Sequence, residues 1–379
     1  MRGFTNSEFT DTTRIHAGRR ILHRFHVDLP LLLGLLALVG VGIMVLYSAS
    51  EQDTDLVVKQ LVRLGIAFTV MFAIAQISPD TLRYWSPWLF SLGLIMLIAV
   101  LLLGEVGKGA QRWLNLGFFT FQPSELMKLA LPMLLAWYLS EANLPPKFKH
   151  VMIAVLMMIV PIFLVAKQPD LGTSLLMASS AIFVLFLAGV RWFYIITSLV
   201  MLVPASLLLW FYGMHDYQRN RVLTFLNPES DLRGAGYHIN QSSIAIGSGG
   251  TYGKGWLNGT QSHLDFLPER KTDFIFPVFS EEFGLIGAII LLTIYAAIVA
   301  RGLVIAAQAQ DTFTRLLAGS ITLTFFIYVF INIGMVSGLL PVVGIPLPLV
   351  SYGGTSMVTL LAGFGILMSI QTHRKLIAS

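Results

Sequence analysis

Between positions 265 and 273 the sequence places three carboxylates and two cations, directly before an apolar run that begins at Phe274. Asp273 is the last charge before this run. A carboxylate at the edge of an apolar medium loses solvation and becomes a stronger base, whereas neighbouring Arg270 and Lys271 would stabilise its charged form. The sequence does not decide which effect is larger. Asp273 is therefore a candidate general base, and a simple belt of charges at the boundary is the alternative interpretation.

Further charged residues lie within or beside long apolar segments. Glu125 and Lys128 are three residues apart, which places them on one face of a helix. Ionisable groups at membrane depth are costly, and most are functional or paired. Mutual pairing, of Glu125 with Lys128 and of Lys167 with Asp170, therefore competes with a shared site. The remaining charges of this kind are Lys108, Arg112, Glu281 and Glu282.

With a cytoplasmic N-terminus, all these groups lie near the outer ends of their segments. A rim of cations and carboxylates suits a substrate with a lipid tail in the bilayer and an anionic head outside it. The cations would hold phosphates by charge-assisted hydrogen bonds, and a carboxylate would act as general base. A secondary transporter instead places its sites near the membrane midplane on broken helices, which disfavours that class.

Composition places these residues in a membrane protein. The chain has 379 residues, of which 55% are hydrophobic and 12% are charged. Soluble proteins are about a quarter charged, and hydrocarbon excludes ions. The net charge of +5 comes from basic residues spread along the chain and does not indicate nucleic-acid binding. With no cysteine and no His-x-x-x-His pair, the sequence predicts neither a disulfide framework nor a thiolate or histidine metal site.

The apolar segments predict an all-α, polytopic membrane protein with about ten transmembrane helices and one large extracytoplasmic loop, 215–276. A membrane-spanning helix takes about 20 apolar residues. The charge-free region 316–372 is divided because Pro341, Gly344, Pro346 and Pro348 would break one continuous helix. The predicted spans are 29–50, 57–77, 84–103, 123–140, 151–166, 171–190, 192–214, 277–300, 314–340 and 349–370.

Charge also predicts the orientation. The arginine-rich residues 1–27 precede a full-length span with no cleavage pattern, so we expect a cytoplasmic tail followed by a signal anchor. When the long loop is left out of the count, this orientation places most lysines and arginines on the cytoplasmic side, as the positive-inside rule requires. Ten spans make up a membrane domain over 28–376, and 377–379 form a cytoplasmic C-terminal tail.

The glycines of the long loop invite a phosphate-loop interpretation, which the spacing excludes. Residues 237–246 predict a short helix that ends at the glycine-rich stretch 247–250. The Walker pattern requires glycine where Ser248 stands, and serine or threonine where Gly255 stands. The loop also lies on the side of the membrane that lacks nucleotide.

Several blocks together resemble the SEDS (shape, elongation, division and sporulation) proteins, which are peptidoglycan glycosyltransferases. The C-terminal block Leu-Val-Ser-Tyr-Gly-Gly-Thr-Ser over 349–356 is the longest, and the resemblance extends over almost the whole chain. Residues 214–219 and the compact length resemble the RodA (elongation) branch more than the FtsW (division) branch. The other matching positions are 108–114, 121–125, 168–173, 272–276, Asn332, Gly338, Leu339, Pro341, Gly344 and Ile345.

The resemblance implies a reaction and a set of site residues. The family polymerises lipid II, a disaccharide-pentapeptide on undecaprenyl pyrophosphate, into glycan strands outside the bacterial cytoplasmic (inner) membrane. Asp273 would be the catalytic base that takes the proton of the acceptor 4-hydroxyl while undecaprenyl pyrophosphate leaves. Arg112 and Lys128 would bind the pyrophosphate. The substrate-binding candidates are Lys108, Arg112, Glu125, Lys128, Asp170 and Asp265, the last often Glu in relatives.

The resemblance also implies partners. RodA-like proteins work in cell elongation with a class B penicillin-binding protein, a transpeptidase that crosslinks the new strands. We therefore expect lipid II, the nascent glycan strand, this transpeptidase and the membrane as partners, and no nucleic acid. A divalent cation, Mg²⁺ or Mn²⁺, stays open as a cofactor, with its ligands unknown. A flippase for lipid-linked precursors and a non-catalytic scaffold of the elongation complex are the alternative functions.

Overall fold

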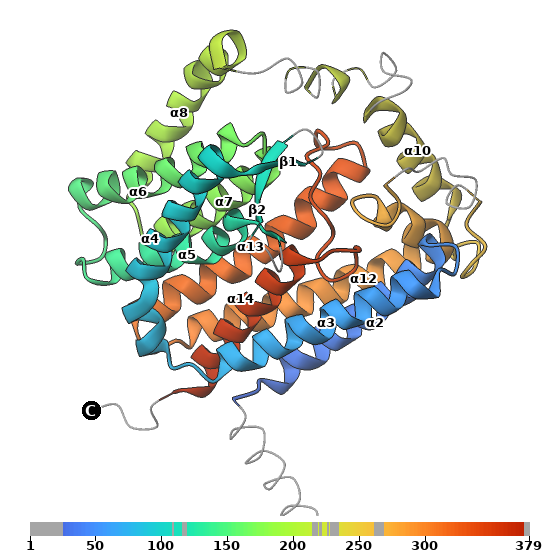
Figure 1. Ribbon diagram of the computed structural model, residues 1–379, viewed down its shortest axis with the longest axis horizontal. Helices are drawn as coiled ribbons and strands as arrows, with labels where there is room; N and C mark the ends of the chain where they lie inside the picture. Colours follow the sequence, from blue (N-terminus) through green and yellow to red (C-terminus); the bar gives the residue numbers. More distant parts are fainter. Residues whose placement is uncertain are drawn as a thin grey trace, which may run out of the picture.

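The computed structural model describes residues 26–107, 110–115, 120–213, 219, 222–225, 227, 235–260 and 269–374. Figure 1 shows a bundle of long helices. These are α2 (Leu29–Ala49), α3 (Thr54–Ala75), α4 (Pro79–Leu103), α5 (Pro123–Ser140), α6 (Phe148–Lys167), α7 (Leu171–Leu187), α8 (Trp192–Leu208), α12 (Ile275–Ala307), α13 (Thr312–Val336) and α14 (Thr355–Thr372). The shorter elements are the π-helix η1 (Leu209–Gly213), α10 (Ala235–Ser248) and the strands β1 (Glu105–Gly107), β2 (Ala110–Asn115) and β3 (Thr120–Phe121).

The helical membrane fold is confirmed, and each predicted span overlaps one of the long helices. In the described part of the chain, seven of these helices are long and apolar enough to cross a membrane: α2, α3, α4, α6, α12, α13 and α14. Helix α5 carries Glu125 and Lys128, and α7 and α8 have only 17 residues each. The number ten therefore stays a prediction. So does the division into tails and membrane domain, since most of both tails lies outside the described residues.

Helices α13 and α14 lie at the centre of the bundle. The rest of the chain buries 67% of the most apolar window of α13 and 61% of that of α14, against 22% for α3, α4, α6 and α12. Helix α14 packs against α3, and α13 packs against α12, α7 and α5, as the ribbon in Figure 1 shows. The outer helices thus present apolar faces to lipid. Polar side chains on α5, α7 and α13 are enclosed by protein.

Polar side chains satisfy the first N–H groups of several helices, which lipid cannot do. Asp28 accepts a hydrogen bond from the Leu31 N–H at the start of α2 (3.0 Å). Asp170 accepts one from the Thr173 N–H at the start of α7 (3.2 Å). Such a cap contributes about 1 kcal/mol. It also fixes the direction of the Asp170 carboxyl, because one of its oxygens is held by the helix.

Helix α12 is broken at Gly284, where the sequence predicted an uninterrupted span over 277–300. Gly284 has φ 64° and ψ −162°, and a Cβ there would lie 2.3 Å from the backbone nitrogen of Gly253. The turn 249–255 packs into the break. Four backbone hydrogen bonds join them: Lys254 N–H to Glu281 C=O and Gly255 N–H to Glu282 C=O (3.0 Å each), Leu285 N–H to Gly250 C=O (2.9 Å) and Ile286 N–H to Thr251 C=O (3.1 Å).

The outer segments contain more regular structure than the sequence predicted. The helix expected over 237–246 is confirmed as α10, with slightly wider bounds. The segment around Arg112, for which the sequence predicted no regular structure, forms a three-stranded antiparallel sheet in the order β1-β2-β3. Glu105 pairs with Trp113, and Leu114 pairs with Phe121. The sheet therefore holds Arg112 on β2, above the starts of α5 and α7.

Candidate functional site

A polar cavity of about 190 Å³ lies where β2, α5, α7 and α13 meet the segment 344–356. Four of the seven predicted site residues line it: Arg112, Glu125, Lys128 and Asp170. Arg112 on β2 and the pair on α5 are close in the sequence, whereas Asp170 at the start of α7 follows Lys128 by 42 residues, and the fold brings all four to one place. The geometry therefore supports a shared site over isolated surface charges.

Lys128 is the buried cation of this cavity. Its ammonium donates to Glu125 Oε1 (2.8 Å) and to the hydroxyl of Tyr328 on α13 (3.0 Å). The predicted pairing with Glu125 thus exists, but both paired side chains still line the cavity. The second carboxylate oxygen of Glu125 is buried and has no hydrogen-bond partner among the described residues. A buried oxygen without a partner is costly, and Glu125 lines a cavity in which a ligand could donate a hydrogen bond to it.

Asp170 is paired with Arg112, and not with Lys167 as the alternative prediction had it. Its Oδ2 accepts from the Gln122 amide (3.1 Å) and lies 3.9 Å from Arg112 Nε. The Lys167 ammonium lies over the ring of Phe163, 4.9 Å from its centroid. Asp170 therefore caps α7 with one oxygen and orients polar side chains of the cavity with the other.

Arg112 is fixed by the backbone at the end of α6. Its Nε donates a hydrogen bond to the Gln168 carbonyl (3.3 Å), and its Nη2 donates one to the Pro169 carbonyl. Gln168 is itself held by the Leu97 carbonyl of α4 (3.3 Å). The Arg112 side chain remains 34% exposed. A guanidinium that is anchored on one edge and open on the other suits an incoming phosphate.

Asp273 lies at the edge of the cavity, just before α12. A Cβ built on Gly344, which lines the cavity, would lie 3.3 Å from Asp273 Oδ2. Gly344 also has φ +78°, so glycine meets both the backbone requirement and the close approach. The carboxylate is thus next to the cavity without being one of its lining residues.

The two remaining predicted site residues, Lys108 and Asp265, fall outside the part of the chain that the structure describes. Sequence reasoning missed Tyr328 and Gln122, which complete the polar network. Gln122 stands inside the block 121–125, which is a signal that could have found it. Tyr328 stands in a charge-free predicted span and had none.

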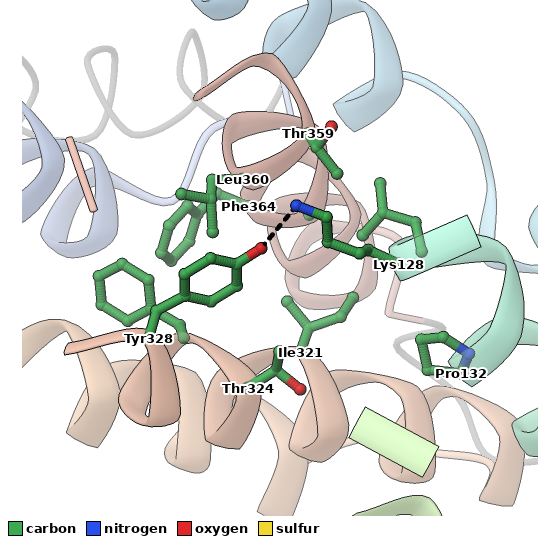
Figure 2. Close-up of a pocket in the computed structure, with 11 residues that line it drawn as sticks. Lys128, Pro132, Ile321, Thr324, Tyr328, Thr359, Leu360 and Phe364 are labelled. Carbon is green, nitrogen blue, oxygen red and sulfur yellow. Dashed lines mark hydrogen bonds between the residues drawn. The ribbon is translucent and has the colours of Figure 1, made fainter. Parts of the chain in front are cut away.

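A second, apolar cavity of about 40 Å³ lies between α5, α13 and α14. Figure 2 shows Lys128 reaching across it from α5 towards the Tyr328 hydroxyl, with Leu360 and Phe364 of α14 behind them. Lys128 and Tyr328 line both cavities. They therefore stand where a charged space borders an apolar one.

The donors do not suit a metal ion held by protein alone. Within the described ranges, no three His, Cys, Asp or Glu side chains lie close enough to hold one. Glu125 and Asp170 line the cavity, but each already contacts a cation.

Comparison with known proteins identifies the family. The chain matches the FtsW/RodA/SpoVE cell cycle protein family over residues 20–376. It is 52% identical over 355 residues to the peptidoglycan glycosyltransferase MrdB of Escherichia coli K12, covering 94% of this chain and 96% of MrdB. It is 39% identical over 362 residues to a probable peptidoglycan glycosyltransferase FtsW of Geobacter metallireducens, covering 92% and 95%.

Solved structures share the fold. A chain from a peptidoglycan synthase complex, described as coordinating polymerization and crosslinking, aligns with a TM-score of 0.81 at 30% identity, covering 92% of this chain and 99% of that one. The rod shape determining protein RodA of Thermus thermophilus aligns with a TM-score of 0.70 at 27% identity, covering 92% and 98%. Sequence and fold together show that the chain belongs to the FtsW/RodA/SpoVE family, the SEDS proteins.

Proposed function

We propose that this chain is a peptidoglycan glycosyltransferase that polymerises lipid II into glycan strands during cell elongation. The observation that carries the proposal is the placement of two cations, Arg112 and Lys128, in one cavity with the carboxylate of Asp273 at its edge. The names of the relatives support the reaction class. This placement brings a candidate base and a candidate phosphate site together.

The chemistry follows from these positions. Asp273 takes the proton of the acceptor 4-hydroxyl as the hydroxyl oxygen bonds to the anomeric carbon of the donor. The bond from that carbon to the pyrophosphate oxygen breaks on the opposite side, so the configuration inverts. Arg112 and Lys128 stabilise the negative charge that develops on the leaving undecaprenyl pyrophosphate. Glu125 and Asp170 keep the two cations in place.

The two adjoining cavities support a lipid-linked substrate. The polar one carries the cations, and the apolar one begins on the other side of Lys128 and Tyr328. A phosphate joined to a hydrocarbon tail has the same division, and the apolar space of about 40 Å³ has room for only the first few atoms of that tail. The Lys128 ammonium at this border would contact the phosphate nearest to the tail.

The cellular setting is part of the proposal. The protein is integral to the membrane, and we place both termini in the cytoplasm and the active site outside. Its partners are lipid II, the nascent strand and a class B penicillin-binding protein. The partner is supported by the similarity to a chain from a peptidoglycan synthase complex that combines polymerization with crosslinking.

The test is Asp273→Asn, which keeps the shape of the side chain and removes the base. We expect the full-length variant in nanodiscs to lose about 10²–10⁴-fold in the rate of lipid II polymerisation. Asp55→Asn, the same change at an exposed position near the start of α3, should keep the wild-type rate. Near-normal polymerisation by well-folded Asp273→Asn protein would exclude Asp273 as the base. Translocation of lipid II without polymerisation would favour a flippase.

A further inference from the structure

The backbone that carries Asp273 is held by groups that are distant in the sequence. Its segment is the turn 269–274, in which the Thr272 and Phe274 N–H groups donate to the Glu269 carbonyl (3.1 Å each), and this turn leads into α12 without a side-chain cap. Regular secondary structure therefore does not fix it. Three consecutive carbonyls instead accept hydrogen bonds: Lys271 from the Tyr352 N–H (2.9 Å), Thr272 from the Ser351 hydroxyl (2.6 Å) and Asp273 from the Asn332 amide (2.9 Å).

Ser351 and Asn332 each form a second hydrogen bond, to the backbone of the segment 345–351 beside the cavity. The Ser351 hydroxyl oxygen accepts from the Leu347 N–H (2.8 Å). The Asn332 amide also donates to the Ile345 carbonyl (2.7 Å). Both side chains are buried, Asn332 completely. Each therefore fastens the segment of Asp273 to the segment 345–351, whose first residue lines the polar cavity.

This arrangement fixes the distance between Asp273 and the polar cavity. Gly344, next to Ile345, is the residue whose added Cβ would contact Asp273 Oδ2. A general base works only within about 2.6–3.2 Å of the proton that it removes. A displacement of about 1 Å costs on the order of 10²-fold in rate. Two buried hydrogen-bonded bridges between base and cavity wall limit such displacement.

We propose that Asn332 and Ser351 are positioning residues that set the distance between Asp273 and the polar cavity. The proposal rests on the proposed role of Asp273 as general base. Neither residue touches the reacting atoms, so removal of its hydrogen bonds should slow the chemical step and leave substrate binding largely intact. A role in folding alone would instead lower the amount and thermal stability of the protein.

The test is a graded series at position 351 in the full-length chain in nanodiscs. Cysteine keeps the approximate size of serine but is a weak donor, and alanine donates nothing. We expect kcat for lipid II polymerisation to fall about 10–100-fold in Ser351→Ala and by a smaller factor in Ser351→Cys. KM for lipid II should stay within about threefold, since the cations that bind the headgroup are unchanged.

Ser320→Ala is the matched control. Ser320 is fully buried on α13, donates to the Ser180 carbonyl (2.8 Å), and lies twelve residues before Asn332, or roughly 18 Å along the helix. The Ser320→Ala variant should lose about as much thermal stability as Ser351→Ala and keep the wild-type kcat. Asn332→Ala should lower kcat like Ser351→Ala, and the double variant should lose less than the product of the two effects, because both hold one segment.

Three outcomes separate this proposal from the one on which it rests. Near-normal polymerisation by Asp273→Asn overturns the proposed role of Asp273 as general base, and the positioning role falls with it. An inactive Asp273→Asn together with wild-type kcat in Ser351→Ala and Asn332→Ala overturns only the positioning role. A loss confined to KM, or one matched by Ser320→Ala, does the same. If Ser351→Ala does not accumulate, Ser351→Cys and Asn332→Ala decide by the same criteria.

Discussion

Two clusters of buried charge lie near the predicted outer ends of the helices, and they differ in what surrounds them. Around Lys128, an ammonium, a carboxylate and a tyrosine hydroxyl line a cavity that also holds the partly exposed Arg112. Around Glu281, the carboxylate is completely buried. Its Oε1 accepts from the Lys254 ammonium (2.6 Å), the Thr260 N–H (2.9 Å) and the Thr260 hydroxyl (3.0 Å).

The difference teaches that buried charge alone does not mark an active site. The Glu281 cluster fastens the turn 249–255 to the break in α12, next to the backbone bonds that replace the helical ones there. Its role is to stabilise the packing of this turn against α12. The Lys128 cluster joins cations from separate elements around open space, which a ligand can enter. The two clusters should therefore respond to mutation in different quantities, one in stability and the other in turnover.

The largest effect on turnover among these pairs is expected for Lys128→Met. Methionine keeps the length of the side chain and removes the cation, so kcat/KM for lipid II should fall about 10²–10³-fold. The variant also leaves Glu125 buried without its partner, which by itself is destabilising. The double variant Lys128→Met, Glu125→Gln removes that problem and should fold like the wild type while staying inactive.

Recovery of activity in this double variant would contradict the comparison. It would mean that Lys128 only neutralises Glu125, as Lys254 neutralises Glu281, and that the substrate phosphate binds elsewhere. Polymerisation rates of the single and double variants, normalised to folded protein, decide between the two.

Much of the fold could be predicted from the sequence because hydrocarbon imposes a long, uniform pattern. Apolar runs identified each long helix, and Pro341 to Pro348 correctly divided the last region. The break at Gly284 could not be predicted. It depends on a turn about thirty residues earlier in the chain, and a glycine within an apolar helix is no local signal for it. The sheet that holds Arg112 was missed because its strands are short.

The candidate site was predictable as far as its residues carry charge. Arg112, Glu125, Lys128 and Asp170 stand out because ions are rare in apolar segments. Tyr328 and the support of Asp273 by Asn332 and Ser351 depend on tertiary contacts between α13 and the segment 344–356. Neutral polar residues are less costly in the membrane, so their position in the sequence says little about their partners.

A smaller effect, and one of another kind, is expected for Lys254→Met. The Glu281 carboxylate would keep its bonds from Thr260 but lose its cation. Because Lys254 is 28% exposed, the expected cost is about 1–3 kcal/mol, below the range for fully buried pairs. Thermal unfolding in detergent should therefore begin a few degrees lower. Polymerisation per folded molecule should stay within about twofold of the wild type, and loss of turnover without loss of stability would place this cluster in the active site.

The smallest effect is expected for Arg83→Gln. Arg83 at the start of α4 pairs with Glu141 at the end of α5 (2.5 Å), and both side chains are well exposed, by 37% and 60%. Water stabilises each of these exposed charges almost as well as its partner does. The free energy of unfolding should therefore fall by less than about 0.5 kcal/mol. Thermal unfolding and polymerisation should both match the wild type. A shift as large as that of Lys254→Met would show that enclosure by protein does not control the strength of these pairs, and the contrast between the two buried clusters would then need another physical cause.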